Sequence, residues 1–222
     1  RFTMRYAVIL PTLNGMKTIK RALPSILNQT SPPAKVCVVD GGSVDGTWDY
    51  LQEEAKVNKI LYVKRNDLSN KMAIAIVHHY NLALSLLGKS YDAYFFHADD
   101  CVFPHDYVLS LHARMKADGV DVASGNFTMP SALDNQRAVA GAGRLVTNRV
   151  MATLGFHFPE IYGYESFLLI KTEQLGYKQK CYPDIRFELL TKFGIEAWHP
   201  AADDNIGEGH NFYEWGRAMR VL

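Results

Sequence analysis

The stretch Lys35–Thr47, KVCVVDGGSVDGT, joins the pattern of a buried strand to a tight turn and the start of a helix. Its first five residues form a valine-rich apolar run, which is typical of a strand buried on both faces. The two glycines after Asp40 allow a sharp turn, and Ser43 or Asp45 can cap a helix that begins near Thr47. A strand that turns through a loop of this kind into a helix is the repeating unit of α/β folds.

Strand patterns and helix patterns alternate along the first half of the chain. Short apolar runs predict four strands, at Tyr6–Leu10, Lys35–Val39, Lys59–Lys64 and Asp92–Phe96. Apolar residues at helical spacing predict four helices, at Lys17–Gln29, Trp48–Lys56, Ser69–Leu87 and Pro104–Ala117. Strands that alternate with helices pair in parallel, so we expect an α/β fold with a Rossmann-like, mostly parallel sheet and helices on both faces.

The second half of the chain is less regular. Its patterns predict one strand and three helices, at Val120–Phe127, Arg144–Leu154, Glu165–Leu175 and His210–Leu222. No linker-like composition separates the two halves, so we expect a single domain, residues 1–222, with an irregular C-terminal half. The last predicted helix is amphipathic, with tryptophan and arginine side chains, and could lie at an anionic membrane surface or pack against the domain.

The composition is that of a globular protein with almost no net charge. Of the 222 residues, 48% are hydrophobic and 21% are charged, and 24 Lys and Arg against 23 Asp and Glu leave a net charge of +1. This length is enough to bury a substantial core, and the near-neutral charge argues against a nucleic-acid partner. The three cysteines, Cys37, Cys101 and Cys181, are far apart, so neither a disulfide framework nor a zinc cluster is expected.

Targeting signals are not evident in the sequence. No apolar run approaches the roughly 18–20 residues of a membrane span, and no signal-peptide pattern opens the sequence. We therefore expect a cytoplasmic location. Peripheral membrane contact and a homodimer stay open.

Polar clusters follow three of the predicted strands, at Pro11–Asn14, Asp40–Asp45 and His97–Asp100. Parallel sheets bind ligands beyond the carboxyl ends of their strands, so these clusters predict one site. Asp40 could accept a hydrogen bond from a base N–H or a ribose hydroxyl, or its loop could be only a turn with a helix cap. The pair Asp99 and Asp100 offers the oxygen ligands that Mg²⁺ and Mn²⁺ prefer, although capping and plain exposure explain a carboxylate pair equally well.

Five segments, taken together and in order, resemble the family 2 glycosyltransferases, which have the GT-A fold. These segments are VILPTLNG (Val8–Gly15), SILNQTSPPAKVCVVDGGSVDGT (Ser25–Thr47), VKRND (Val63–Asp67), FFHADD (Phe95–Asp100) and GYESFLLIKTEQLGYK (Gly163–Lys178). The resemblance implies an inverting transfer of a sugar from a UDP- or GDP-type donor to a hydroxyl of a glycan, lipid-linked or protein acceptor. It also implies a nucleotide-sugar-binding half, residues 1–118, and an acceptor-binding half, residues 119–222.

The resemblance implies a role for particular side chains on the donor side. The residues placed against the nucleotide sugar are Pro11, Thr12, Leu13, Asn14, Asp40, Gly42, Asn66, Lys71, His97 and Ala98. Among them, Thr12 and its neighbours would line the base pocket, Asp40 would bind base or ribose, and Lys71 would assist at the phosphate.

Metal binding and acid–base chemistry fall to four further residues. Asp99 would hold a divalent cation, Mn²⁺ or Mg²⁺, that bridges the diphosphate, and His199 stands where some family members have a histidine close to the metal. Glu165 would be the general base that takes the acceptor proton. Glu160 is the rival for that role.

The sequence departs from the family pattern at two places, and these departures suggest a second possible function. His97 replaces the first aspartate of the metal motif, and Tyr164-Glu165 replaces the usual Glu-Asp of the base motif. These changes motivate the alternative of a catalytically inactive nucleotide-sugar-binding module, which donor turnover would distinguish. A nucleotide-sugar pyrophosphorylase is a third reading, but PTLNG lacks the glycine-rich, basic first loop that it would need.

Overall fold

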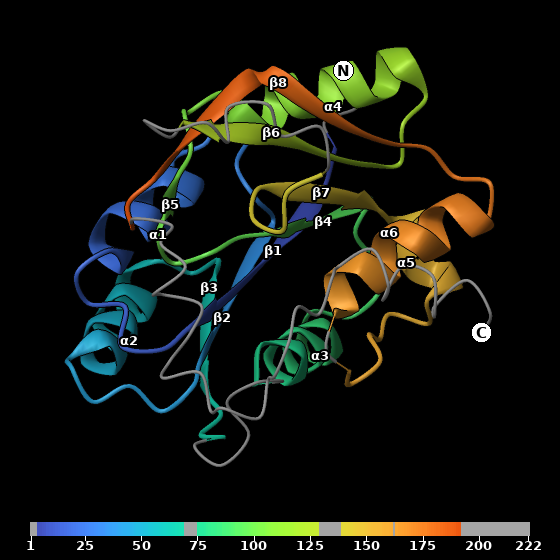
Figure 1. Cartoon of the computed structure of the whole chain (residues 1–222). Helices are drawn as coiled ribbons and strands as arrows, with labels where there is room; N and C mark the ends of the chain where they lie inside the picture. Colours follow the sequence, from blue (N-terminus) through green and yellow to red (C-terminus); the bar gives the residue numbers. More distant parts are fainter. Residues whose placement is uncertain (1–3, 69–74, 129–138, 162, 192–222) are drawn as a thin grey trace, which may run out of the picture.

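The computed structural model describes residues 4–68, 75–128, 139–161 and 163–191. It is a single α/β domain built on one eight-stranded sheet with the strand order β3-β2-β1-β4-β7-β6-β8-β5 (Figure 1). The strands are β1 (Tyr6–Thr12), β2 (Lys35–Asp40), β3 (Leu61–Arg65), β4 (Ala93–Phe96), β5 (Cys101–Val102), β6 (Val122–Thr128), β7 (Arg144–Thr147) and β8 (Gln179–Leu189). The helices are α1 (Ile19–Leu27), α2 (Thr47–Val57), α3 (Ala75–Leu87), α4 (Tyr107–Asp118), α5 (Asn148–Thr153) and α6 (Tyr164–Gln174).

The sheet is curled and mostly parallel. Strands β3, β2, β1 and β4 pair in parallel, as the alternating sequence pattern predicts. Strand β7 pairs antiparallel with both β4 and β6, and β8 pairs in parallel with β6. Strands β1, β2, β3, β4, β6 and β8 therefore share one direction, and their carboxyl ends meet at one edge of the sheet.

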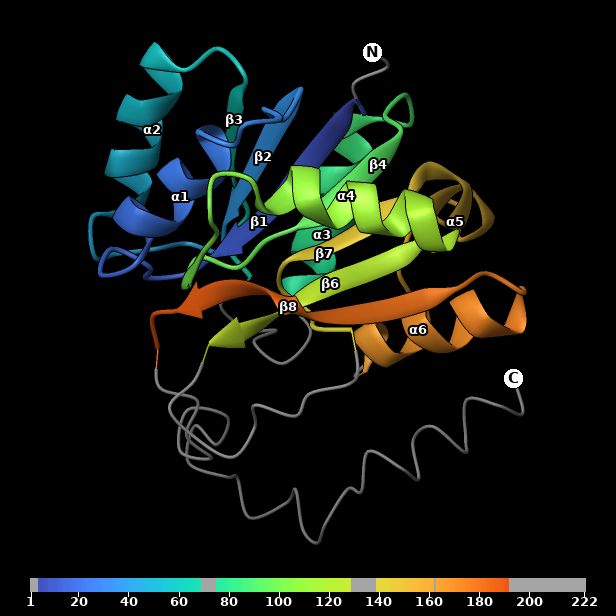
Figure 2. The same ribbon diagram turned by 90° about the horizontal axis from the view of Figure 1, so that it is seen from above.

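Helices cover both faces of the sheet, and each face has its own apolar core (Figures 1 and 2). Alternate residues of β1 enter different cores: Val8 packs with α1, α2 and α4, whereas Ile9 packs with α3, α5 and α6. Cys37 of β2 is a buried residue of the second core, as predicted. A strand that is buried on both faces reads as a continuous apolar run, which is why β1, β2 and β4 are recognisable in the sequence.

The structure corrects the prediction for Arg144–Leu154. Its first four residues form strand β7, and the helix α5 begins only at Asn148. The apolar spacing of the segment is compatible with a helix, but β7 is hydrogen-bonded between β4 and β6. Tertiary pairing thus outweighs local propensity. The sequence patterns also missed β5 and β8.

Two predicted helices reach beyond the described residues. The described part of Ser69–Leu87 is α3, from Ala75 to Leu87, and His210–Leu222 lies entirely outside them. Within the described ranges, no helix is long and apolar enough to cross a lipid bilayer.

Candidate functional site

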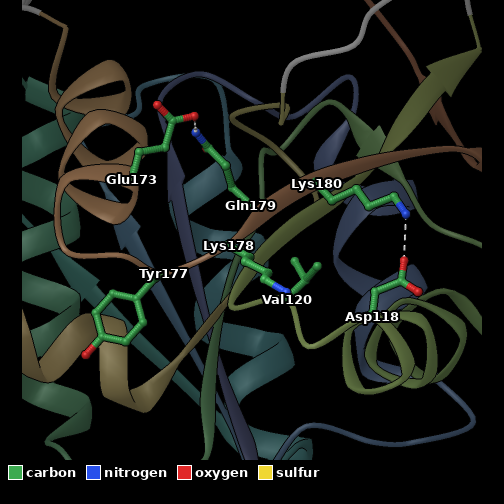
Figure 3. A pocket seen from close by; sticks show the side chains of 7 residues that line it. All are labelled: Asp118, Val120, Glu173, Tyr177, Lys178, Gln179 and Lys180. Atoms are coloured by element: carbon green, nitrogen blue, oxygen red, sulfur yellow. Dashed lines mark hydrogen bonds and ion pairs between the residues drawn. The ribbon is translucent and has the colours of Figure 1, made fainter.

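A groove of about 500 Å³ lies where β6 and β8 begin, at the edge of the sheet opposite the predicted site. It is lined by Asp118, Val120, Glu173, Tyr177, Lys178, Gln179 and Lys180 (Figure 3). Nζ of Lys180 lies 2.6 Å from Oδ2 of Asp118, and Nε2 of Gln179 donates to Oε1 of Glu173 at 2.6 Å. These side chains pair with each other across the groove, and the carboxylate cluster predicted from the sequence lies elsewhere.

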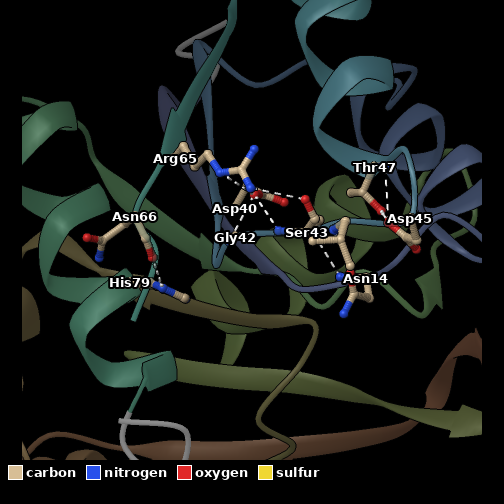
Figure 4. A network of polar contacts seen from close by, with 10 residues as sticks. Asn14, Asp40, Gly42, Ser43, Asp45, Thr47, Arg65, Asn66 and His79 are labelled. Atoms are coloured by element: carbon tan, nitrogen blue, oxygen red, sulfur yellow. Dashed lines mark hydrogen bonds and ion pairs between the residues drawn. The ribbon is translucent and has the colours of Figure 1, made fainter. Parts of the chain in front are cut away.

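The loops after β1 and β2 are tied together at the carboxyl edge of the sheet (Figure 4). The backbone N–H of Asn14 donates to Oγ of Ser43 at 2.8 Å, and its side-chain Oδ1 accepts from the backbone N–H of Val44 at 2.9 Å. The backbone N–H of Met16 donates to Oδ2 of Asp45 at 3.0 Å. Asn14 has a φ of 51°, in the left-handed region that asparagine tolerates better than most residues. The two loops thus form one rigid wall, with Asn14 as its centre.

Asp40 ends β2 and is fully buried within this wall. Its Oδ1 accepts hydrogen bonds of 3.0 Å from the backbone N–H groups of Gly42 and Ser43, and Nε of Arg65 lies 4.0 Å from the same oxygen. Its Oδ2 is also buried but has no hydrogen-bond partner among the described residues. Leaving a buried acceptor unpaired costs about 1–3 kcal/mol, and a hydrogen bond from a ligand would remove this cost.

Helix α3 closes the far side of the Asp40 loop through His79. The ring of His79 is buried, and its Nε2 lies 3.1 Å from the backbone oxygen of Asn66, whose own N–H donates to the backbone oxygen of Asp40. Burial lowers the pKa of His79, so the ring is neutral at neutral pH. A Cβ on Gly41 would lie 3.0 Å from this ring, so glycine allows the loop to pack against α3.

Asp99, for which the sequence predicts a cation site, follows β4 and lies beside Thr12 at the end of β1. Oγ1 of Thr12 donates a 2.5 Å hydrogen bond to its Oδ2, and the backbone N–H of Leu13 also donates to the carboxylate. Burial, together with the charge of Asp100, nevertheless raises the pKa of Asp99 to about 6. A Cβ on Gly15 would overlap the Asp99 carboxylate. Glycine at this position therefore leaves room for the carboxylate.

The donor atoms at this point fit a divalent cation in part. Asp99 and Asp100 are adjacent carboxylates, and Oδ2 of Asp100 accepts a 2.5 Å hydrogen bond from Oγ1 of Thr191. In the part of the chain that the structure describes, no three His, Cys, Asp or Glu side chains form a complete metal cluster. Mg²⁺ and its relatives commonly take one or two carboxylates and complete their coordination with water and substrate phosphates. His199 and Lys71, predicted for the metal and the phosphate, lie outside the described residues.

The structure turns the side chain of His97 into the core. The ring is 1% exposed and packs edge-on against Phe103, with 4.8 Å between ring centroids. Its Nδ1 lies 2.5 Å from the backbone oxygen of Ala98, and its Nε2 lies 3.3 Å from that of Ala22 in α1. Burial lowers its pKa to about 4, so it is neutral. Both ring nitrogens face backbone carbonyls, so the structure does not support the ligand-binding role predicted for this side chain.

Glu165 stands in the first turn of α6, where it faces a loop of the second half of the chain. A Cβ on Gly141 would overlap its carboxylate, so the two groups are in close contact. Beside it, the buried phenols of Tyr80 and Tyr164 hydrogen-bond to each other. Burial raises the pKa of both phenols, Glu165 raises them further, and Arg144 lowers them. A base candidate and a buried cation thus flank one tyrosine pair.

The rival base, Glu160, has a different partner. Its Oε1 lies 3.0 Å from Nδ1 of His78 in α3, and its side chain is half-exposed. Of the two glutamates, Glu165 is the one that, like Arg144, acts on the phenols of Tyr80 and Tyr164. The sequence predicts no site role for Arg144, Tyr80 or Arg65, although Arg65 lies in the VKRND segment. One feature of the sequence could have indicated Arg144: it directly precedes the apolar residues Leu145 and Val146. An arginine at the start of a buried strand is itself buried, and so is Arg144.

Known proteins match this chain in sequence. The family model described as glycosyl transferase family 2 matches residues 7–168. Glycosyltransferase GlyA of Streptococcus pneumoniae serotype 4 is 24% identical over 198 residues, which are 87% of this chain and 27% of that protein. An uncharacterized glycosyltransferase of Haemophilus influenzae is 30% identical over 98 residues, which are 44% of this chain and 29% of that protein. The chain therefore spans less than a third of the length of these curated relatives.

Solved GT-A glycosyltransferases share its fold. The mannosyltransferase PcManGT from Pyrobaculum calidifontis, in complex with GDP-Man and Mn²⁺, superposes with a TM-score of 0.72 at 22% identity, over 89% of this chain and 60% of that chain. A fragment of S. aureus TarS in complex with UDP gives a TM-score of 0.65 at 17% identity, over 85% of this chain and 61% of that chain. The family model spans most of the chain and the fold agrees with it: the chain belongs to glycosyl transferase family 2.

Proposed function

We propose that this chain is an inverting glycosyltransferase that moves a sugar from a UDP- or GDP-type donor to an acceptor hydroxyl, assisted by a divalent cation. The observation that carries the proposal is the buried Asp40 carboxylate, whose Oδ2 lacks a partner among the described residues at the carboxyl edge of the sheet. A base N–H or a ribose hydroxyl supplies the missing donor. Family membership supports sugar transfer as the reaction.

The nucleotide side of the proposed site is the wall formed by the loops after β1 and β2. Pro11, Thr12 and Leu13 would line it, while Asn14 and Gly42 hold the loop that shapes it. Two related folds support the choice of nucleotide: TarS has been solved with UDP and with UDP-GlcNAc, and PcManGT with GDP-Man. Asn66 and Ala98 would complete the pocket, and Lys71 would reach the phosphates.

A cation at Asp99 would also take phosphate oxygens of the donor. When bound, it would offset the charge that the departing nucleoside diphosphate acquires. Asp100 lies beside Asp99 and adds to the negative potential there, and His199 would add a nitrogen ligand. The 2.5 Å hydrogen bond from Thr12 to Oδ2 would hold the Asp99 carboxylate in place for the cation.

Glu165 would act as the general base of the transfer. Its carboxylate would accept the proton of the acceptor hydroxyl as that oxygen forms a bond to the anomeric carbon of the donor sugar. The bond from the anomeric carbon to the diphosphate would break in the same displacement, which inverts the anomeric configuration. General-base catalysis of this kind contributes about 10²–10⁴-fold to a rate. The acceptor would lie in the half formed by residues 119–222 and can be a glycan, a lipid-linked sugar or a protein.

Donor turnover tests the proposal. The protein is incubated with UDP-GlcNAc or GDP-mannose, each with Mn²⁺, with Mg²⁺ or with EDTA, and release of the nucleoside diphosphate is measured. We expect release from one nucleotide class, dependent on the cation and lost in Glu165→Gln. Binding of a nucleotide sugar without any release or transfer, with a panel of sugar acceptors present, would favour the inactive binding module instead.

A further inference from the structure

Asn126 of β6 is a buried side chain with nothing to bind. It is 0% exposed, and both its Nδ2 and its Oδ1 lack a hydrogen-bond partner among the described residues. An amide carries two N–H donors and an acceptor, and burying such a group unpaired costs about 1–3 kcal/mol. The stability of the fold alone therefore does not explain this residue.

The direction of the Asn126 side chain follows from the regularity of β6. Ala123 and Phe127 pack into the core on the α4 side, so Ser124 and Asn126 face the opposite side, toward α3 and α6. The irregularity in the pairing of β6 with β8 lies in β8, where the partner changes from Tyr182 for Gly125 to Arg186 for Asn126. Side-chain alternation in β6 is therefore preserved.

Ser124 and Arg144 place the Asn126 face next to Glu165. Ser124 pairs in register with Arg144 of β7, and both bind the backbone of Ala140: Oγ of Ser124 accepts from its N–H, and Nε of Arg144 donates to its carbonyl oxygen at 2.9 Å. The residue after Ala140 is Gly141, against which the Glu165 carboxylate lies. Asn126 thus faces the same side of the sheet as Arg144, whose partner Ala140 directly precedes the glycine that contacts Glu165.

This region lies on the path of the proposed donor. The strand order runs β2-β1-β4-β7-β6, and neighbouring strands are about 4.8 Å apart, so β6 lies roughly 10 Å beyond β4 across the sheet. The proposed base pocket is at the end of β2, and Asp99 follows β4. The sugar of the donor would come next along this direction, and Asn126 lies near the carboxyl end of β6, at the same edge of the sheet.

We propose that the Asn126 amide hydrogen-bonds to a ring hydroxyl of a sugar that reacts at Glu165 and so determines which sugar is accepted. A sugar hydroxyl both donates and accepts, which matches an amide with both kinds of atom free. The inference rests on the proposed function, since it needs a nucleotide sugar or a sugar acceptor in this site. A site built to hydrogen-bond a hydroxyl rejects analogues that lack it far more strongly than an apolar pocket does.

The test compares Asn126→Leu with the wild-type protein in two properties that should move in opposite directions. Leucine has a similar volume and no polar atoms, so we expect the thermal midpoint to stay within about 2 °C or to rise. Affinity for UDP-GlcNAc or GDP-mannose, whichever the wild type binds, should fall about tenfold. Affinity for the matching UDP or GDP should change less than twofold. If the hydroxyl belongs to the acceptor instead, donor affinity is kept and KM for a sugar acceptor rises about tenfold.

Asn81→Leu is the matched control, because the amide of Asn81 is fully paired: it donates to the carbonyl of Phe158 at 2.9 Å and accepts from its N–H at 2.8 Å. It should lose about 3–10 °C of thermal midpoint with nucleotide affinity unchanged. If Asn126→Leu does not fold, the same affinities are measured on Asn126→Ser. A falling midpoint for Asn126→Leu, with donor affinity and acceptor KM unchanged, would overturn the inference. No nucleotide-sugar binding by the wild type would instead overturn the proposed function.

Discussion

The side chain of Thr12 donates a 2.5 Å hydrogen bond to Oδ2 of Asp99, while the backbone oxygen of Thr12 accepts one from the N–H of Gly41 at 2.8 Å. One residue at the end of β1 therefore ties the loop of the proposed base pocket to the carboxylate of the proposed cation site. In the sequence, the strands β3 and β4 lie between the base-pocket loop and Asp99, but in space both contact Thr12.

Thr12→Val should weaken the donor site through Asp99. Valine has nearly the shape of threonine but no hydroxyl, so the ionised carboxylate loses a stabilising donor and its pKa rises above about 6. We expect the cation-dependent part of nucleotide binding to require a pH about one unit higher than in the wild type. Titration calorimetry from pH 5.5 to pH 8.5 measures this. Thr12→Ser keeps the hydroxyl and should behave as the wild type does.

The pH dependence of stability should also report Asp99. Its pKa of about 6 in the folded protein is above its ordinary value of 3.8, so the native state binds this proton more tightly than the unfolded chain does. The contribution of Asp99 to the free energy of unfolding is therefore largest below pH 4 and is lost as pH rises through 6. Asp99→Asn removes the buried charge, so it should raise the thermal midpoint at pH 8 and leave it nearly unchanged at pH 4. Equal shifts at the two pH values would contradict this assignment.

Two glycine substitutions should separate donor binding from transfer. A Cβ at Gly15 overlaps the Asp99 carboxylate, and a Cβ at Gly141 overlaps that of Glu165. In both cases the end of a side chain moves, so the fold should tolerate the change. Gly15→Ala should lower cation-dependent nucleotide affinity about tenfold. Gly141→Ala should keep that affinity and lower the transfer rate about 10²-fold, the cost of a misplaced reacting group. The same loss of affinity in both variants would show that the two sites are not separate.

Replacing the proposed base should stop the chemistry without affecting the donor. Glu165→Gln keeps the shape of the side chain but cannot accept a proton, so the transfer rate should fall about 10²–10⁴-fold. Affinity for the nucleoside diphosphate should remain within twofold. Glu160→Gln is the matched control, since Glu160 is paired with His78. A large rate loss in Glu160→Gln with none in Glu165→Gln would reverse the assignment of the base.

The sequence predicts β1, β2 and β4 because burial on both faces leaves them continuous apolar runs. It fails for β7, whose four residues resemble the start of a helix until β4 and β6 pair with them. It fails for β8 as well, because Pro183 and Asp184 interrupt the run and the bulged strand alternates poorly. Local patterns carry no information on these long-range pairings.

In the candidate site too, the positions of residues at strand ends can be predicted from the sequence, whereas the orientations of side chains cannot. Asp40, Thr12 and Asp99 follow predicted strands, and the parallel sheet brings their carboxyl ends together. The orientation of His97 depends on the packing of Phe103 and on the carbonyl of Ala22, and Ala22 is distant in sequence. The unpaired amide of Asn126 likewise becomes visible only when its neighbours are known.

The most direct test of this account is nucleotide binding at the end of β2. Titration calorimetry with UDP and GDP, with and without Mn²⁺, is carried out on the wild type and on Asp40→Asn, in which a donor nitrogen replaces the unpaired acceptor oxygen. We expect Mn²⁺ to enhance the binding of one nucleotide to the wild type, and the variant to lose about 10- to 100-fold in affinity, the cost of a charged hydrogen bond. Equal binding to both proteins, or no binding of either nucleotide under any condition, would contradict it.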